Sequence, residues 1–292
     1  MTIDPNDRDA WVRLLREDTA RFGEIREAVG DDVPIDLSGA DLSNLDLSRT
    51  WLGRANLEGA RLTGAQFNVM SLMKCRLKDV VGLDSAVLLF GSENSQRDVR
   101  MLALLWRDIP AFNRERKPTD VITDCDLSGA DLGGADFSNL ALANSRLDGA
   151  ILSKVKIWST NLDQTSLVGA RFDGGVIEAC SLHNANMSHA TFVGATILRA
   201  HWIDAVLDHA RFDGAHIQSS AIIRGSARSA GFRGATLDGC SIGGAKFNDG
   251  DFVDTVWRDC RVHHSDFTGC RFDSARNERS SFGDNVGLPA SL

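Results

Sequence analysis

An apolar side chain recurs at every fifth position over most of this 292-residue chain. Of the 39 positions numbered with a final 2 or 7 in the ranges 37–77 and 127–272, 38 carry Leu, Ile, Phe, Met, Trp or Val, and Ala227 is the exception. A period of five fits neither an α-helix, at about 3.6 residues per turn, nor a flat strand, at about two. Such regularity is typical of a repeat fold.

The residue two places before each apolar position is nearly always small. An extended backbone points both of these residues to one side, and it points the residues between and after them to the other side. Fourteen of the 27 glycines occupy the fifth position, where the chain must turn. The sequence therefore predicts a coiled chain with stacked apolar side chains inside. Met70, at a position for small residues, is oversized.

Units such as Ala130-Asp-Leu-Gly-Gly and Ala135-Asp-Phe-Ser-Asn resemble the A(D/N)Lxx units of the pentapeptide-repeat family. The resemblance covers about two thirds of the chain. It implies an all-β solenoid, a right-handed quadrilateral parallel β-helix, and four units per turn would give about ten coils. No proline falls inside either repeat tract, which leaves every backbone donor available for pairing between coils.

The repeat pattern divides the chain into five segments. We expect an N-terminal capping segment with an amphipathic helix over 6–29, a first repeat tract, a helical insertion, a second tract and an irregular tail, at 1–34, 35–82, 83–124, 125–275 and 276–292. The phase of the period is unchanged across the insertion, which favours one continuous rod. Two separate β-helices are the alternative.

The insertion contains a predicted helix from Ser95 to Ile109. Beside one apolar stripe it carries Met101, Leu104 and Leu105, which make it apolar nearly all round. One contact face needs fewer apolar residues than this. The helix is therefore either cover for the solenoid or an element that recognises a partner.

The sequence gives little sign of catalytic or metal chemistry. It carries no phosphate loop, dinucleotide fingerprint or zinc-type cysteine pair, so we expect no enzyme, no cofactor and no metal site. All six cysteines fall on small inward positions, as core residues do. His183, His201 and His263 are expected on one outer face as ordinary surface residues. No apolar run is long enough to span a membrane, and the acidic N-terminus differs from a signal peptide, so we expect a cytoplasmic protein.

The family resemblance also suggests a function. Some members protect DNA gyrase and related topoisomerases by mimicking DNA, in antibiotic resistance or self-immunity. Rows of aspartate that begin the second tract would contribute to such mimicry: Asp126, Asp131 and Asp136. The net charge from residue 125 onward is only −4, from 19 acidic and 15 basic residues. No direct binding to nucleic acid is expected. A homodimer is open, although the C-terminus lacks the helical module through which known members dimerise.

A second candidate surface consists of apolar residues at outward positions. Ile203 and Ile223 are expected one coil apart on the same face, and Trp158 and Leu198 point out from the neighbouring face. A cluster of exposed apolar residues indicates a contact site. The alternative function is therefore a scaffold or regulatory module that binds an unrelated protein.

Overall fold

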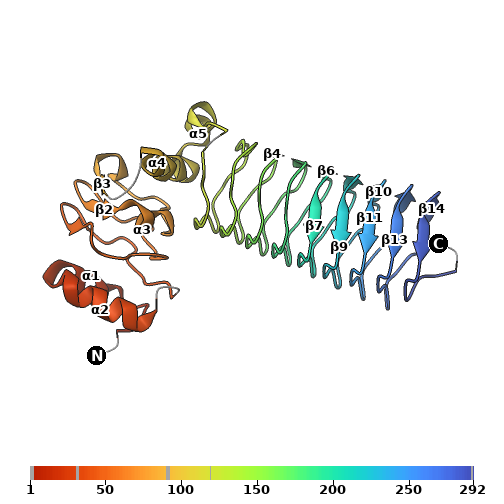
Figure 1. The fold of residues 1–292 in the computed structure, drawn as a ribbon, viewed down its shortest axis with the longest axis horizontal. Helices are drawn as coiled ribbons and strands as arrows, with labels where there is room; N and C mark the ends of the chain where they lie inside the picture. Colours follow the sequence, from red (N-terminus) through yellow and green to blue (C-terminus); the bar gives the residue numbers. More distant parts are fainter. Residues whose placement is uncertain (1–2, 31–32, 90–92, 119, 291) are drawn as a thin grey trace. The chain divides into compact units, whose positions relative to one another are not determined.

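The structure, a computed structural model, describes residues 3–30, 33–89, 93–118, 120–290 and 292. The chain divides into two compact units, Met1–Leu127 and Ser128–Leu292, which we call the N-terminal and C-terminal units. In each unit the backbone coils and pairs with the next coil in parallel (Figure 1). The fold is thus the predicted parallel β-solenoid, with about 11 turns and a few helices.

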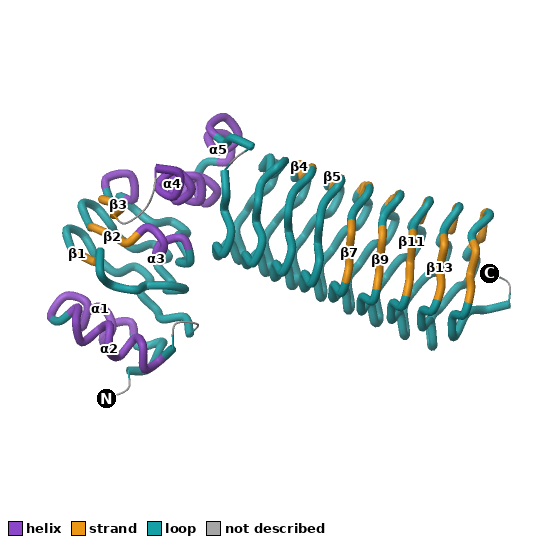
Figure 2. The backbone as a smooth tube through the Cα atoms, viewed as in Figure 1, coloured by secondary structure: helices purple, strands orange, loops and turns teal. Residues whose placement is uncertain are grey.

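The C-terminal unit shows how many repeats close one turn. Ile157 pairs with Ile177, which pairs with Ile197, so each coil contains 20 residues or four five-residue units. Two parallel sheets of short strands run along the stack (Figure 2). The seven-stranded sheet consists of β4 (Lys156–Trp158), β5 (Val176–Glu178), β6 (Thr196–Leu198), β8 (His216–Gln218), β10 (Thr236–Asp238), β12 (Val256–Arg258) and β14 (Arg276–Glu278). The five-stranded sheet consists of β7 (His201–Ile203), β9 (Ala221–Ile223), β11 (Ser241–Gly243), β13 (Arg261–His263) and β15 (Ser281–Gly283).

In the C-terminal unit, every repeat from residue 129 to residue 284 turns through a left-handed backbone conformation at its fifth residue. All fourteen glycines at that position have positive φ, for example 64° at Gly214. The same conformation is adopted by residues of other types, including Ala179 at 53° and Arg199 at 51°. None of the non-glycine residues with positive φ is β-branched, because a branched Cβ clashes most strongly there. The left-handed conformation at the corner is thus required by the coil whatever the residue, and glycine lowers its conformational cost.

The inward residues form a continuous core in the C-terminal unit. Six phenylalanines at a spacing of 20 residues stack face to face, with neighbouring ring centroids 4.7–5.2 Å apart. They are Phe172, Phe192, Phe212, Phe232, Phe252 and Phe272. Ala227, the exception to the period, is nevertheless fully buried. The six cysteines are free thiols, and all but Cys270 are fully buried, as expected for core residues.

The N-terminal segment forms two helices where one was predicted over 6–29. α1 (Arg8–Glu17) ends at Asp18, and α2 (Thr19–Val29) begins there, because the Asp18 carboxylate accepts a hydrogen bond from the amide of Arg21 at 2.9 Å. Trp11 of α1 packs against Phe22 of α2, with centroids 5.4 Å apart. The carbonyl of Pro5 accepts a hydrogen bond from the amide of Asp36 in the first coil. The segment thus satisfies a backbone donor that the first coil would otherwise leave unpaired.

The first tract departs from the regular coil more than its sequence suggests. β1 (Asp46–Leu47), β2 (Gln66–Asn68) and β3 (Val87–Leu89) form one parallel sheet, so pairing continues beyond the predicted boundary at residue 82. A short helix, α3 (Val69–Met73), replaces one corner. The oversized Met70 is half exposed there, and Ser71 is buried instead. A short 3-10 helix, η1 (Leu83–Ser85), precedes β3.

The insertion holds two helices where one was expected. α4 (Glu93–Arg107) is followed by α5 (Ile109–Glu115), and the carboxylate of Asp108 caps α5 by accepting from the amide of Ala111 at 2.8 Å. α4 packs against both α3 and α5. Asp126 then pairs with Arg76, fifty residues earlier, where regular coils pair at twenty. The chain therefore returns to the coil register after the insertion.

The predicted irregular tail is wrong for most of its length. β14 and β15 pair with β12 and β13, and Val286 forms a further bridge to Asp266. The pattern of apolar residues stops at Asn277, but backbone hydrogen bonds to the preceding coil continue, such as that from the amide of Arg276 to the carbonyl of Thr255 at 2.8 Å. The coil is thus held by its main chain after its apolar period has ended.

Candidate interaction surface

The outward residues of the strands define the walls that the C-terminal unit offers to other molecules. In strands β4 to β13 the middle residue is buried in the core, and the first and third residues point out, with only Gly243 of β11 buried among them. Four neighbouring strands, β6 to β9, carry only uncharged residues at these outward positions. We call this set the neutral patch: Thr196, Leu198, His201, Ile203, His216, Gln218, Ala221 and Ile223.

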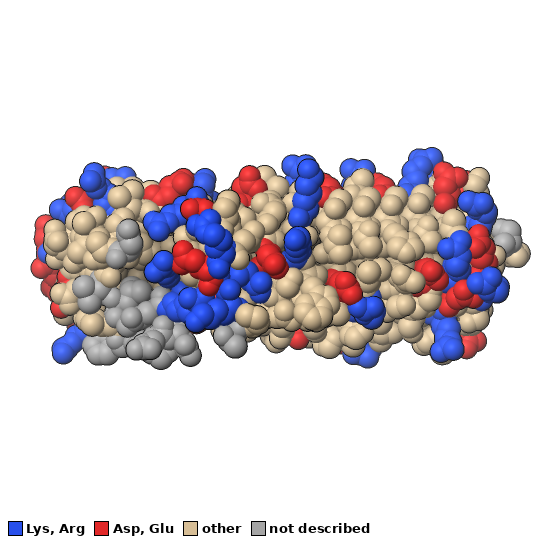
Figure 3. Space-filling model, turned by 90° about the horizontal axis from the view of Figure 1, so that it is seen from above, with Lys and Arg blue, Asp and Glu red and all other residues tan. Residues whose placement is uncertain are grey.

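Ile203 and Ile223 lie in the five-stranded sheet as predicted. They are direct partners in the register of β7 and β9, and both are half-buried. Leu198 lies in β6 of the seven-stranded sheet, one corner earlier in the same coil, and is also half-buried. The neutral patch therefore spans two sheets, which meet at a corner formed by Arg199 in one coil and by Ser219 in the next. In a space-filling view from the side of the seven-stranded sheet, uncharged residues cover a broad area of this unit, with charged residues at its margins (Figure 3).

Charged pairs border the neutral patch. At the corner after Ile203, two guanidinium nitrogens of Arg224, Nε and Nη2, donate to the Asp204 carboxylate at 2.9 and 2.6 Å. That hydrogen bonding lowers the pKa of Asp204. At the corner between β6 and β7, Arg199 pairs with Glu178 of the preceding coil. An uncharged centre with a charged rim is the arrangement that protein interfaces commonly show.

Trp158 does not belong to this patch. Its side chain is 47% exposed in β4, but Glu178 lies between it and Leu198 in the register of the sheet. The four apolar residues predicted to cluster therefore form a patch of three and one separate tryptophan.

Three other predicted partner-binding residues are not accessible. Met101, Leu104 and Leu105 of α4 are 0%, 5% and 1% exposed. The helix is apolar nearly all round because it packs on more than one side. The interpretation of these side chains as a recognition surface is therefore wrong, and they are core residues of the N-terminal unit.

The predicted aspartate rows have a structural role at the corners of the coil. The carboxylate of Asp131 accepts a hydrogen bond from the amide of Gly133 at 3.1 Å, and that of Asp136 accepts from the amide of Ser138 at 3.0 Å. Asp36 and Asp41 make the same contact two residues on. Asp126 occupies the equivalent position and pairs with Arg76 through the backbone. Aspartate is thus favoured before the central apolar residue because it caps the turn.

A second set of aspartates was not recognised in the sequence. Asp208 accepts hydrogen bonds from the amide of Arg228 at 2.8 Å and from the Ser226 hydroxyl at 2.6 Å, both in the next coil. Asp148 and Asp163 make equivalent pairs of contacts. The sequence signal is an aspartate after the central apolar residue, with serine 18 residues later.

A wall of ion pairs faces a different side of the coil. Arg211 contacts Asp213 at 2.7 Å, and Arg271 lies 3.6 Å from Asp251 and 3.9 Å from Asp273. Because these carboxylates have arginine neighbours, the wall does not present a row of uncompensated negative charge.

The remaining candidates for chemistry are sparse among the residues that the structure describes. No group of three His, Cys, Asp or Glu side chains there could hold a metal ion. Burial raises the pKa of Cys75 to about 12 and that of Cys180 to about 11, which disfavours the reactive thiolate. No described helix is long and apolar enough to cross a membrane.

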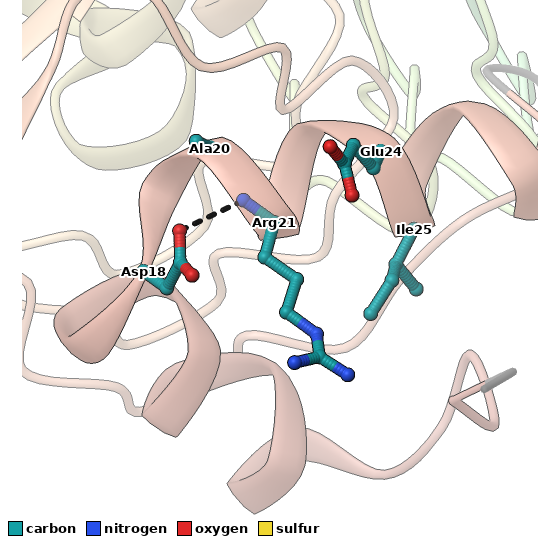
Figure 4. A pocket seen from close by; sticks show the side chains of 5 residues that line it. All are labelled: Asp18, Ala20, Arg21, Glu24 and Ile25. Carbon is teal, nitrogen blue, oxygen red and sulfur yellow. Dashed lines mark hydrogen bonds between the residues drawn. The ribbon is translucent and has the colours of Figure 1, made fainter.

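One open hollow of about 340 Å³ lies on the surface of α2 (Figure 4). It is lined by Asp18, Ala20, Arg21, Glu24 and Ile25. The carboxylate of Asp18 already caps the helix, and the other lining residues come from successive turns of the same helix. The hollow therefore brings together no groups from separate elements.

The geometry defines a class of protein: a parallel β-solenoid that presents flat, rigid walls. A trypsin-treated variant of QnrB1, a plasmid-mediated fluoroquinolone resistance protein, is 19% identical over 54% of this chain and 79% of its own, with a TM-score of 0.38. HetL, involved in heterocyst differentiation regulation in the cyanobacterium Nostoc sp. strain PCC 7120, is 19% identical over 86% and 91%, with a TM-score of 0.25.

No curated protein sequence matches this chain. The family profile for pentapeptide repeats matches with 8 copies, over residues 35–79, 122–158, 150–188, 159–197 and 180–220. The chain is a member of the pentapeptide-repeat family, as the sequence units suggested.

Proposed function

We propose that this protein is a non-enzymatic binding protein that presents the neutral patch to a protein partner. The observation that carries the proposal is the register pair Ile203–Ile223. These two residues belong to the eight of the neutral patch, none of which is Asp, Glu, Lys or Arg. The ion-paired wall, in contrast, carries charged residues at its outward positions, such as the pairs Arg211–Asp213 and Arg271–Asp251.

The physical properties of the patch favour a protein over nucleic acid. A nucleic-acid interface needs clustered Lys and Arg, whereas this chain has a net charge of −8 and the patch contains neither Lys nor Arg. The strands are fixed by parallel pairing on both sides, so little backbone freedom is lost when a partner binds. A flat and rigid apolar centre is therefore suited to another folded surface.

The specific candidate partner is DNA gyrase or a related type II topoisomerase. This candidate rests on the resemblance of the repeats to topoisomerase-protecting members of the family. DNA mimicry in its simplest form needs uncompensated carboxylates, but Asp213 and Asp251 are paired with arginine. The binding that we propose rests instead on the neutral patch. A regulatory or scaffold role with an unrelated partner is the alternative.

A supercoiling assay with purified gyrase and a quinolone tests the candidate partner. Three proteins are compared: the unchanged chain, the double variant Ile203→Lys with Ile223→Lys, and Val193→Lys as a matched control. Val193 is an outward, half-buried residue on the ion-paired wall. Arg233 occupies the same position two coils further on, so a long basic side chain fits there. Protection by the unchanged chain and the control, but not by the double variant, supports both partner and patch.

The other outcomes separate the two parts of the proposal. If the unchanged chain neither protects nor inhibits gyrase, the topoisomerase candidate is removed. The patch is then tested by comparing the proteins that co-purify with the three forms. Equal recovery of every partner by the double variant and the unchanged chain would rule out the patch.

A further inference from the structure

Two adjacent histidines of the C-terminal unit bring ring nitrogens together. His263 ends β13, and His264 forms the following corner with φ of 52°. Their Nδ1 atoms are 3.2 Å apart, and their ring planes meet at 80°. Both side chains are exposed. The pair lies outside the neutral patch, and the proposed function does not use it.

The neighbouring coils leave space around the His263 ring. Its register partners are Gly243 in the coil before and Gly283 in the coil after, so neither presents a side chain. A Cβ added to Gly243 would lie 2.6 Å from Cε1 of His263, which shows that the ring rests directly over this glycine. Glycine at position 243 therefore permits the orientation that brings the two Nδ1 atoms together.

A carboxylate lies near the second imidazole. Oδ2 of Asp284 lies 3.6 Å from Nε2 of His264. A hydrogen on Nε2 would face this carboxylate, and the tautomer with that hydrogen leaves the Nδ1 lone pair free to bind. A carboxylate behind a histidine is also the usual outer support of a metal-binding imidazole.

We propose that His263 and His264 form a binding site for a divalent transition metal of the zinc type, with both Nδ1 atoms as ligands. At a Zn–N distance of about 2.0–2.1 Å, two nitrogens of a tetrahedral site lie about 3.3 Å apart. The observed 3.2 Å matches this spacing. Water completes the coordination, because both rings are exposed. Without metal, the same two atoms share a hydrogen bond, so one Nδ1 carries a proton. Metal binding moves that proton to Nε2 of the same ring or releases it to solvent.

Calorimetric titration with Zn²⁺ alone, on the full chain without an affinity tag, tests the site. We expect one saturable site per chain and no binding of Mg²⁺, which prefers oxygen ligands. His264→Ala and Gly243→Ala should each lower the affinity at least about tenfold, and Asp284→Asn by about 10–100-fold. His189→Ala and His216→Ala, which remove exposed or half-exposed histidines elsewhere on the unit, should leave it unchanged.

A second readout separates ligation from a change in folding. Nitrogen-15 spectra of the imidazoles should show Zn²⁺ shifting Nδ1 of His263 and His264, with Nε2 of both less affected. Circular dichroism checks that each variant remains folded. The absence of a saturable site, or unchanged affinity in folded His264→Ala, would overturn the assignment.

Discussion

The ring of Phe212 stacks on that of Phe192 with centroids 4.7 Å apart and planes 2° from parallel. The distance equals the usual spacing of paired strands, about 4.7–4.9 Å, so the side-chain column and the backbone ladder have the same period. Phe232 continues the stack on the other side at 4.8 Å. One residue thus contacts both neighbouring coils through its two faces.

We expect Phe212→Ala to lower the free energy of unfolding of the C-terminal unit by about 3–5 kcal/mol, because it leaves a cavity between two rings. Chemical denaturation followed by circular dichroism measures this. Gln218→Ala, at the exposed last position of β8, should change stability by less than about 0.5 kcal/mol. Equal effects of the two substitutions would show that the ring column does not hold the coils together.

The corner at Gly214 isolates the effect of backbone conformation. Its φ is 64°, and no atom lies within 4 Å of an added Cβ, so a side chain there meets no steric obstacle outside its own backbone. We expect Gly214→Val to cost about 1–3 kcal/mol of stability. Gly214→Asn should cost less, because asparagine tolerates the left-handed region. A valine variant as stable as the asparagine variant would contradict the requirement for that conformation.

The ion pair between Arg97 of α4 and Asp120 should make the N-terminal unit sensitive to acid. The two side chains are 2.7 Å apart, and the Asp120 carboxylate is only 2% exposed. Burial opposes ionisation, but hydrogen bonds from Arg97 and from the amide of Lys117 outweigh it, so the pKa of Asp120 lies below its ordinary value of 3.8. Stability from this group is present above that value and is lost as pH falls through the lower, folded pKa.

The measurement is the free energy of unfolding of the N-terminal unit as a function of pH, followed by tryptophan fluorescence. Asp120→Asn should reduce the loss of stability below about pH 4, since the amide does not titrate there. The variant should also be less stable at neutral pH. If the variant loses as much unfolding free energy at low pH as the unchanged chain, the acid sensitivity comes from other carboxylates.

The insertion should behave as part of the N-terminal core. We expect Leu105→Ala to lower the stability of that unit by about 2–5 kcal/mol, because the side chain is 1% exposed. Arg107→Ala, on the exposed end of the same helix, should have an effect of less than about 0.5 kcal/mol. If instead Leu105→Ala leaves stability unchanged and abolishes partner binding, the helix is a recognition element after all.

The sequence predicted those features that depend on the type of residue at one position of the repeat. The apolar residue at every fifth position identified the core, since an inward slot excludes water from whatever fills it. Ile203 and Ile223 were placed correctly because a register of 20 residues follows from four equal units. The small inward position of all six cysteines likewise predicted core residues, and five of the six are buried.

The sequence did not predict those features that depend on main-chain pairing or on contact with an element distant in the chain. Arg276 begins another strand although its segment lacks the apolar period, because backbone pairing needs no particular side chain. Met101 and Leu104 are buried by helices whose packing the local pattern does not reveal. The contact between His263 and His264 depends on Gly243 in another coil, and the only sequence signal is the histidine doublet itself.

The central claim is that the neutral patch contacts a protein. Site-specific photo-crosslinking in cells tests it directly, with p-benzoylphenylalanine placed at position 223 or, as the control, at position 193. We predict a discrete crosslinked species from position 223 that contains a second protein, and none from position 193. No crosslinked species from position 223, or the same species from both positions, would contradict the claim.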